Sequence, residues 1–174
     1  TASGTVKRFA FPAGLELGFQ AASIANRAVL TAFDPESGAG LYAVGEQGSS
    51  LQLLTALPSS NTELHVPDSS RGFVATLEGN QTRIWTTDAT PAGTSPILTL
   101  DYGLHLLAAE RLGAEYMLFV GQSDGPVLMV RTSGSAQGTS IVPGLESVSG
   151  AGIVETAEFE GAVYVTLFVD GRIA

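Results

Sequence analysis

Short apolar runs, separated by turn residues, recur along the whole chain. Four of them are rich in β-branched and aromatic residues, which favour strands: RAVLTAF (27–33), GFVATLEG (72–79), EYMLFVG (115–121) and AVYVTLFVDG (162–171). Turn chemistry such as Gly79-Asn80 or Asp124-Gly125 follows each run, and Gly carries the positive φ that a tight hairpin requires. The pattern therefore predicts a β-hairpin at each of the four places.

Three further apolar runs belong to the same unit as each of these four runs, which makes four strands in about 44 residues. One run follows the turn, for example TRIWTT (82–87), and another follows a Gly-Thr step, for example SPILTL (95–100). A fourth run, for example TELHVP (62–67), precedes the hairpin. Leu104–Phe119 is the one helix-like stretch, but Gly113 interrupts it and its repeat partners resemble strands, so a hairpin is predicted there as well.

A period underlies these runs. Gly93-Thr94 and Gly138-Thr139 stand 45 residues apart, and Gly4-Thr5 opens the chain in the same frame. The apolar residues that close each unit, at positions 11, 57, 100 and 145, are spaced by 46, 43 and 45. Because fixed periods of 20–50 residues indicate repeat architectures, we predict one repeat domain divided at 1–11, 12–57, 58–100, 101–145 and 146–174, the last unit being incomplete.

The period favours a particular all-β architecture. A single four-stranded unit cannot bury both of its faces, and runs such as YMLFV are apolar on both. Sheets must therefore pack on sheets. Linear stacking gives a β-solenoid and radial stacking a β-propeller, and four strands in 40–50 residues match a propeller blade. The expected fold class is thus a set of four-stranded antiparallel propeller blades.

Composition excludes several classes of function. The chain has 174 residues, is 44% hydrophobic, and carries a net charge of −9 with only 8 Lys and Arg residues. Such a surface repels phosphates and anionic lipids, so neither nucleic acid nor a membrane surface is an expected partner. The absence of cysteine excludes disulfides, thiolate metal sites and a cysteine nucleophile. No apolar run approaches the roughly 18–20 residues that span a bilayer.

The stretch IWTTDATPAGT (84–94) resembles a known repeat. It is similar to the units of bacterial exported ELWxxDGT-repeat proteins, with Trp85 on the Leu-Trp pair, Asp88 in the turn and Gly93-Thr94 at the ending. Ala89 stands where that family has glycine. The copy that begins at Val130 keeps only three of these positions, namely Gly134, Gly138 and Thr139. The resemblance implies a propeller-like fold and a secreted or cell-surface bacterial protein, and it implies no established reaction.

The repeat frame also predicts how the units continue. The chain opens in the middle of a motif and ends about five residues short of the equivalent point, so we expect a segment of a larger propeller, about four of seven or eight blades. In the alternative, VKRFAF (6–11) pairs beside GRIA (171–174) and closes a four-bladed ring.

Few side chains indicate chemistry. Asp88, Thr90 and Thr94 are candidate calcium ligands, but an Asp and Thr that stabilise their own turn is the preferred interpretation, because calcium normally takes several carboxylates. Asp34 and Glu36, in the acidic turn DPESGAG (34–40), form a second candidate pair. No metal or other cofactor is otherwise expected.

The remaining candidates favour packing over catalysis. Tyr42 and Val130 replace Trp85 in the other repeats, which favours packing between units over a sugar-stacking platform. The two histidines, His65 and His105, occupy non-equivalent places in their repeats. His65 and Asp68 would form a triad with a serine only on paper, because no G-x-S-x-G elbow surrounds a serine.

These observations favour a non-enzymatic module. The expected function is an extracellular or cell-surface scaffold that binds protein or polysaccharide, or assembles with copies of itself. The alternative is a segment of a propeller hydrolase or lyase that acts on extracellular polysaccharides. That alternative requires a cluster of His, Asp or Glu on the innermost strands, and no such cluster is evident from the sequence.

Overall fold

The computed structural model describes residues 14–45, 50–122, 126–143, 151–169 and 172–173, and these residues form strands and turns without any helix. The all-β prediction is confirmed. The ambiguous stretch Leu104–Phe119 is a hairpin of β9 (His105–Leu112) and β10 (Glu115–Gly121), as predicted. Gly113 supplies its turn with a φ of +62°, a conformation that a side chain disfavours.

The strands form consecutive antiparallel sheets. The first sheet contains β1 (Glu16–Ile24), β2 (Arg27–Asp34), β3 (Gly38–Val44) and β4 (Leu51–Ala56). The second sheet contains β5 (Thr62–Asp68), β6 (Arg71–Glu78), β7 (Gln81–Thr87) and β8 (Ser95–Leu100). The third sheet contains β9, β10, β11 (Val127–Thr132) and β12 (Thr139–Val142). The fourth sheet contains β13 (Ala151–Phe159), β14 (Ala162–Val169) and β15 (Arg172–Ile173).

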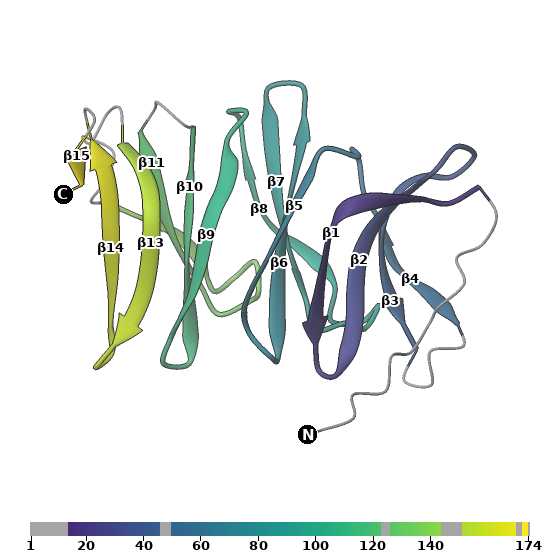
Figure 1. Cartoon of the computed structure of the whole chain (residues 1–174), viewed down its shortest axis with the longest axis horizontal. Helices are drawn as coiled ribbons and strands as arrows, with labels where there is room; N and C mark the ends of the chain where they lie inside the picture. Colours follow the sequence, from purple (N-terminus) through teal and green to yellow (C-terminus); the bar gives the residue numbers. More distant parts are fainter. Residues whose placement is uncertain (1–13, 46–49, 123–125, 144–150, 170–171, 174) are drawn as a thin grey trace, which may run out of the picture.

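The four sheets stand side by side in chain order, from purple at one end to yellow at the other (Figure 1). Their first strands begin at positions 16, 62, 105 and 151, which are 46, 43 and 46 residues apart. Strand order within each sheet follows the chain, so every unit is a simple meander. Among the described residues the row is open and no ring is closed. The strand predicted at 6–11 lies outside those residues.

Apolar side chains on both faces of the second sheet hold the row together. Alternation along β6 sends Phe73 toward the third sheet and Val74 toward the first, and both are fully buried. On β7, Ile84 likewise faces the third sheet and Trp85 faces the first sheet. We call the contact between the first and second sheets the first interface, and that between the second and third sheets the second interface. The prediction that sheets pack on sheets is confirmed.

A repeated β-bulge adds one core side chain to each interface. Between β3 and β4 the register slips at Leu54, and between β7 and β8 it slips at Ile97, which is 43 residues further on. Each bulge leaves the extra residue unpaired in the ladder. Leu54 and Ile97 are both buried, the former in the first interface and the latter in the second.

A repeated arginine also links neighbouring sheets. Arg27 begins β2 and Arg71 begins β6. The Arg27 guanidinium donates a hydrogen bond to the carbonyl oxygen of Ala89, in the β7–β8 turn of the second sheet. Arg71 reaches the equivalent turn of the third sheet, where a Cβ added to Gly134 would lie only 3.0 Å from its side chain. Each arginine therefore joins its own sheet to the next turn in the row.

Candidate binding cavity

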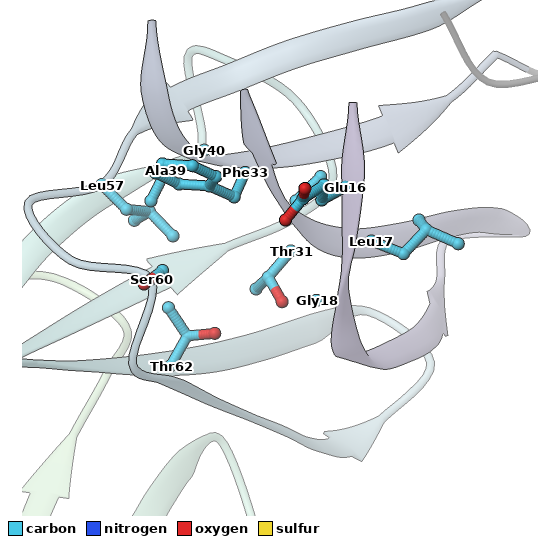
Figure 2. A pocket seen from close by; sticks show the side chains of 11 residues that line it. Glu16, Leu17, Gly18, Thr31, Phe33, Ala39, Gly40, Leu57, Ser60 and Thr62 are labelled. Carbon is cyan, nitrogen blue, oxygen red and sulfur yellow. The ribbon is translucent and has the colours of Figure 1, made fainter. Parts of the chain in front are cut away.

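A cavity of about 410 Å³ lies at the first interface, where the end of the β2–β3 hairpin faces the link to β5 (Figure 2). Its lining combines β1, β2 and β3 with the segment that enters the second sheet. The residues are Glu16, Leu17, Gly18, Thr31, Ala32, Phe33, Ala39, Gly40, Leu57, Ser60 and Thr62. A volume of this size falls within the roughly 300–1,000 Å³ typical of small-molecule sites.

Two substitutions between repeats leave this space open. Asn61 directly precedes β5 and is exposed, whereas Leu104, which directly precedes β9, is only 6% exposed and fills the second interface. Ala39, which pairs with Phe33 on β2, has Thr82 as its counterpart one unit along. The Thr82 hydroxyl accepts a hydrogen bond from the Leu104 amide and donates one to the Leu104 carbonyl, each at 2.7 Å. At the first interface, Asn61 does not fill the space that Leu104 fills at the second interface, and Ala39 has no hydroxyl to hold a residue there.

The Thr31 hydroxyl is the most unusual group in the lining. Thr31 is 3% exposed, and in the described part of the chain its Oγ1 has no hydrogen-bond partner. Figure 2 shows its side chain at the centre of the group, with Phe33 above it and Thr62 below. Across from it, β1 is irregular between Leu17 and Ala21, and a Cβ at Gly18 would lie 2.2 Å from Thr31 Oγ1. A buried hydroxyl without a partner costs roughly 1–3 kcal/mol, so this position is not explained by stability.

The rest of the lining is neutral apart from one carboxylate. Ser60 and Thr62 add two hydroxyl groups, and Glu16 adds a solvent-exposed carboxylate. Phe33 is 38% exposed, so part of its ring is accessible, and buried Leu57 extends the apolar wall. The lining residues that the structure describes include no lysine, arginine or histidine. The cavity therefore presents hydroxyl groups beside an apolar surface, without positive charge.

The predicted turn around Asp88 is held by its own side chains. Asp88 Oδ1 accepts hydrogen bonds from the Thr90 amide at 2.9 Å and the Thr90 hydroxyl at 2.7 Å. The Gly93 amide donates to the Thr90 hydroxyl at 3.0 Å, and the Thr94 hydroxyl donates to the Thr90 carbonyl at 2.6 Å. These are the bonds of a self-stabilised turn. In the part of the chain that the structure describes, no three acidic or histidine side chains gather as a metal site.

The turn of the third sheet repeats most of these hydrogen bonds. The Gly138 amide lies 3.2 Å from the Ser135 hydroxyl, and the Thr139 hydroxyl donates to the Ser135 carbonyl at 2.6 Å. In both turns the hydroxyls at the two ends meet, Thr87 with Thr94 at 2.7 Å and Thr132 with Thr139 at 2.6 Å.

The same two turns share a left-handed residue. Gly134 has a φ of +83°, and Ala89 adopts the equivalent left-handed conformation with a φ of +67°. The fold thus requires the conformation for which glycine is the usual residue, and Ala89 adopts it despite its Cβ. The predicted repeat residues Gly4 and Thr5 lie outside the described residues.

Trp85 is buried at the first interface. Its side chain is 7% exposed, and its indole Nε1 donates to the Thr76 hydroxyl at 3.4 Å. A ring packed in this way presents no face to a sugar.

Asp34 and Glu36 occupy the β2–β3 turn. Asp34 Oδ1 accepts hydrogen bonds from the amides of Glu36 at 2.8 Å and Ser37 at 2.9 Å. The backbone amides of Ser37 and Glu36 hold the pKa of Asp34 below its usual value, because they stabilise the charged carboxylate. This carboxylate therefore acts as the acceptor of an Asx turn.

The structure brings together a group that sequence reasoning missed. Glu63 on β5 and His105 on β9 come from the first strands of neighbouring sheets, and Glu63 Oε1 lies 2.5 Å from His105 Nδ1. The second carboxylate oxygen of Glu63 accepts the Leu106 amide at 2.6 Å. His65 lies on the same strand as Glu63, and burial lowers its pKa more than Glu63 and a backbone hydrogen bond with Leu106 raise it. Only strand register, which the sequence does not state, reveals that these residues meet.

Asp68 has partners other than His65. Its carboxylate accepts hydrogen bonds from the Ser70 hydroxyl at 2.6 Å and the Tyr116 hydroxyl at 3.2 Å, and Arg111 lies 3.4 Å away. Burial raises the pKa of Asp68, but the hydrogen bonds from Ser70 and Tyr116 outweigh it and leave the pKa below its usual value. Asp68 thus joins the second and third sheets.

Comparisons with known proteins do not assign the chain to a family. No family model matches it, and no curated protein is significantly similar to it. In the described part of the chain, no helix has the length and apolar character to cross a bilayer.

Proposed function

We propose that the chain is a run of β-propeller blades that acts as a non-enzymatic, extracellular or cell-surface binding scaffold. One observation carries the propeller assignment. Among the described residues, the first strands of neighbouring sheets lie side by side, β1 with β5, β5 with β9 and β9 with β13, whereas the fourth strands do not contact one another to a comparable extent. Sheets that approach at one edge and diverge at the other fan out, as blades do around an axis.

The binding role is supported by a difference between the polar groups of the turns and those of the cavity. The turns in which motif residues recur satisfy their own hydrogen bonds, as the Asp88 turn does. The cavity at the first interface, in contrast, contains a buried Thr31 hydroxyl that none of the described residues pairs, beside an accessible aromatic ring. Similarity to the ELWxxDGT repeats supports export to the cell surface, where protein, polysaccharide and further copies of the chain are the available partners.

A second candidate is the polysaccharide hydrolase or lyase, and the Glu63–His105 pair is the observation that favours it. A carboxylate beside a histidine on first strands has the composition of an acid–base pair. Glu63, however, already accepts a hydrogen bond from the Leu106 amide, and His105 is partly exposed at the start of β9. These contacts fit a link between strands, so the binding scaffold is preferred.

The two functions are separated by a combined binding and turnover experiment. The chain is applied to immobilised bacterial and plant polysaccharides, and retention is measured together with the release of soluble sugar or unsaturated products. Retention without product supports the scaffold. Product release that disappears in Glu63→Gln establishes the enzyme and overturns the proposal. Electron microscopy of the protein as its gene encodes it tests the fan of sheets, and a linear stack would refute the propeller.

A further inference from the structure

The buried Thr31 hydroxyl has no hydrogen-bond partner among the residues that the structure describes. Thr31 is only 3% exposed and lines the cavity. By contrast, the buried Thr76 hydroxyl on β6 donates to the Arg83 carbonyl at 3.3 Å and accepts from Trp85 at 3.4 Å. Buried hydroxyls in folded proteins are normally paired. A ligand hydroxyl in the cavity would give Thr31 the partner that the described residues do not supply.

The charges of the lining exclude several ligand classes. An anionic ligand would meet the Glu16 carboxylate, and the described lining residues include no lysine, arginine or histidine to offset it. A divalent cation normally requires more than one carboxylate, and Glu16 provides the only carboxylate among the described lining residues. A wholly apolar ligand would cover the hydroxyls of Thr31, Ser60 and Thr62 without pairing them, which is unfavourable.

A neutral sugar has the combination of groups that remains. A pyranose ring carries hydroxyl groups around its rim and aliphatic C–H groups on its faces. The hydroxyls of Thr31 and Thr62 and the Glu16 carboxylate match the rim, and the accessible part of the Phe33 ring together with Leu57 matches a face. In Figure 2, Phe33 and Leu57 lie above and to the left of Thr31, Thr62 lies below it, and Glu16 lies near Phe33.

We propose that the cavity at the first interface binds a neutral pyranose residue of a polysaccharide, with Thr31 as its central hydrogen-bonding group. This inference rests on the proposed binding function and names its site and ligand class. Glu16 and Thr62 bind other hydroxyls of the same ring, and Phe33 contacts one of its faces. The second interface has no equivalent site, because Leu104 occupies the corresponding space.

The test uses a panel of methyl glycosides of glucose, galactose, mannose and N-acetylglucosamine, with acetate, sulfate and benzyl alcohol as charged and apolar comparisons. Binding is measured by saturation-transfer NMR and by the rise in melting temperature at millimolar ligand. We expect one or more neutral glycosides to bind and the comparison compounds to give no signal. Binding of sulfate or acetate in preference to every glycoside overturns the assignment of ligand class.

Two variants locate the binding, and one controls for folding. Thr31→Val removes the hydroxyl while keeping the shape of the side chain, and we expect it to weaken glycoside binding by about tenfold or more. Ser60→Leu, at an exposed rim position, narrows the cavity and is expected to abolish binding. Thr76→Val removes a buried hydroxyl outside the cavity and leaves the affinity unchanged.

The outcomes distinguish this inference from the proposed function. Glycoside binding that Thr31→Val and Ser60→Leu leave unchanged refutes the cavity as the site, while the binding scaffold stands. Retention on polysaccharide without any glycoside signal also refutes the cavity. Turnover of polysaccharide by any of the variants refutes the proposed non-enzymatic function itself.

Discussion

The first and second interfaces are built to the same plan but filled differently. Both contain a bulge residue on the fourth strand, Leu54 or Ile97, and both are linked by an arginine at the start of a second strand. The second interface is closed by Leu104, which Thr82 anchors through two hydrogen bonds. The first interface keeps a cavity of about 410 Å³ at the corresponding place.

The difference shows that a repeat separates structural from functional positions. Several positions that set backbone geometry keep their residue types between the second and third sheets, since their Gly-Thr turns share the hydrogen bonds of the threonine hydroxyls. The position before the first strand is free to change from leucine to asparagine, because the bulges, arginines and turns already hold the sheets. A binding site is therefore expected at an interface that lacks the residue filling it elsewhere. Four measurements test the contrast between the first and second interfaces.

The largest effect is expected from leucine truncation at the filled interface. Leu106 is buried at the second interface, and Leu106→Ala should cost about 3–5 kcal/mol of unfolding free energy, because the dense surroundings leave a cavity behind. Leu57→Ala, beside the existing cavity, should cost about 1–2 kcal/mol less, because fewer packed neighbours are lost. Urea unfolding measures both. Equal losses would show that the first interface is packed as tightly as the second.

The next effect comes from the arginine at the first interface. Arg27→Met keeps much of the aliphatic length and removes the hydrogen bond to the Ala89 carbonyl, so we expect a loss of about 1–2 kcal/mol. The matched control is Gln52→Ala, which deletes the exposed partner of Arg27 within its own sheet and should change little. Thermal unfolding followed by circular dichroism compares the two. A larger loss for Gln52→Ala would contradict a link between sheets.

A smaller effect of opposite sign separates two buried threonines. Thr31→Val removes a hydroxyl that has no partner among the described residues, and it should raise the unfolding free energy of the ligand-free protein by about 1 kcal/mol. Thr76→Val breaks two hydrogen bonds and leaves the Trp85 indole unpaired, so it should lower the unfolding free energy by about 1–2 kcal/mol. Destabilisation by both variants would show that Thr31 is paired in solution.

The weakest effect is the pH dependence of His65. Burial lowers its folded-state pKa below the unfolded value of 6.5, so the unfolded chain takes up the proton first. The stability that neutral His65 contributes is present above pH 6.5 and decreases as the pH falls toward the folded-state pKa. Urea midpoints measured across this range should show the decrease, and His65→Gln should reduce it. An unchanged slope in the variant would assign the pH dependence to other groups.

Strands and turns were predictable from the sequence because their signals are local. The apolar runs and the Gly-containing turns predicted the hairpins, including the one at Leu104–Phe119. The cavity was not predictable, because it depends on the alignment of Ala39 with Thr82 and of Asn61 with Leu104 in three dimensions. The Glu63–His105 contact was missed for the same reason. Residues 42 apart meet only when the register between neighbouring first strands is known.

The order of strands within each sheet has a consequence for how the protein forms. Every described sheet consists of consecutive strands without a crossover, so at most about 40 neighbouring residues contain nearly all of its backbone pairing. Short sequence separation between contacting residues favours rapid folding, and units emerging from a ribosome are able to fold one after another. A gene that encodes such units lengthens by duplication without disturbing those already made, and each new copy is free to lose a filling residue and acquire a specificity of its own.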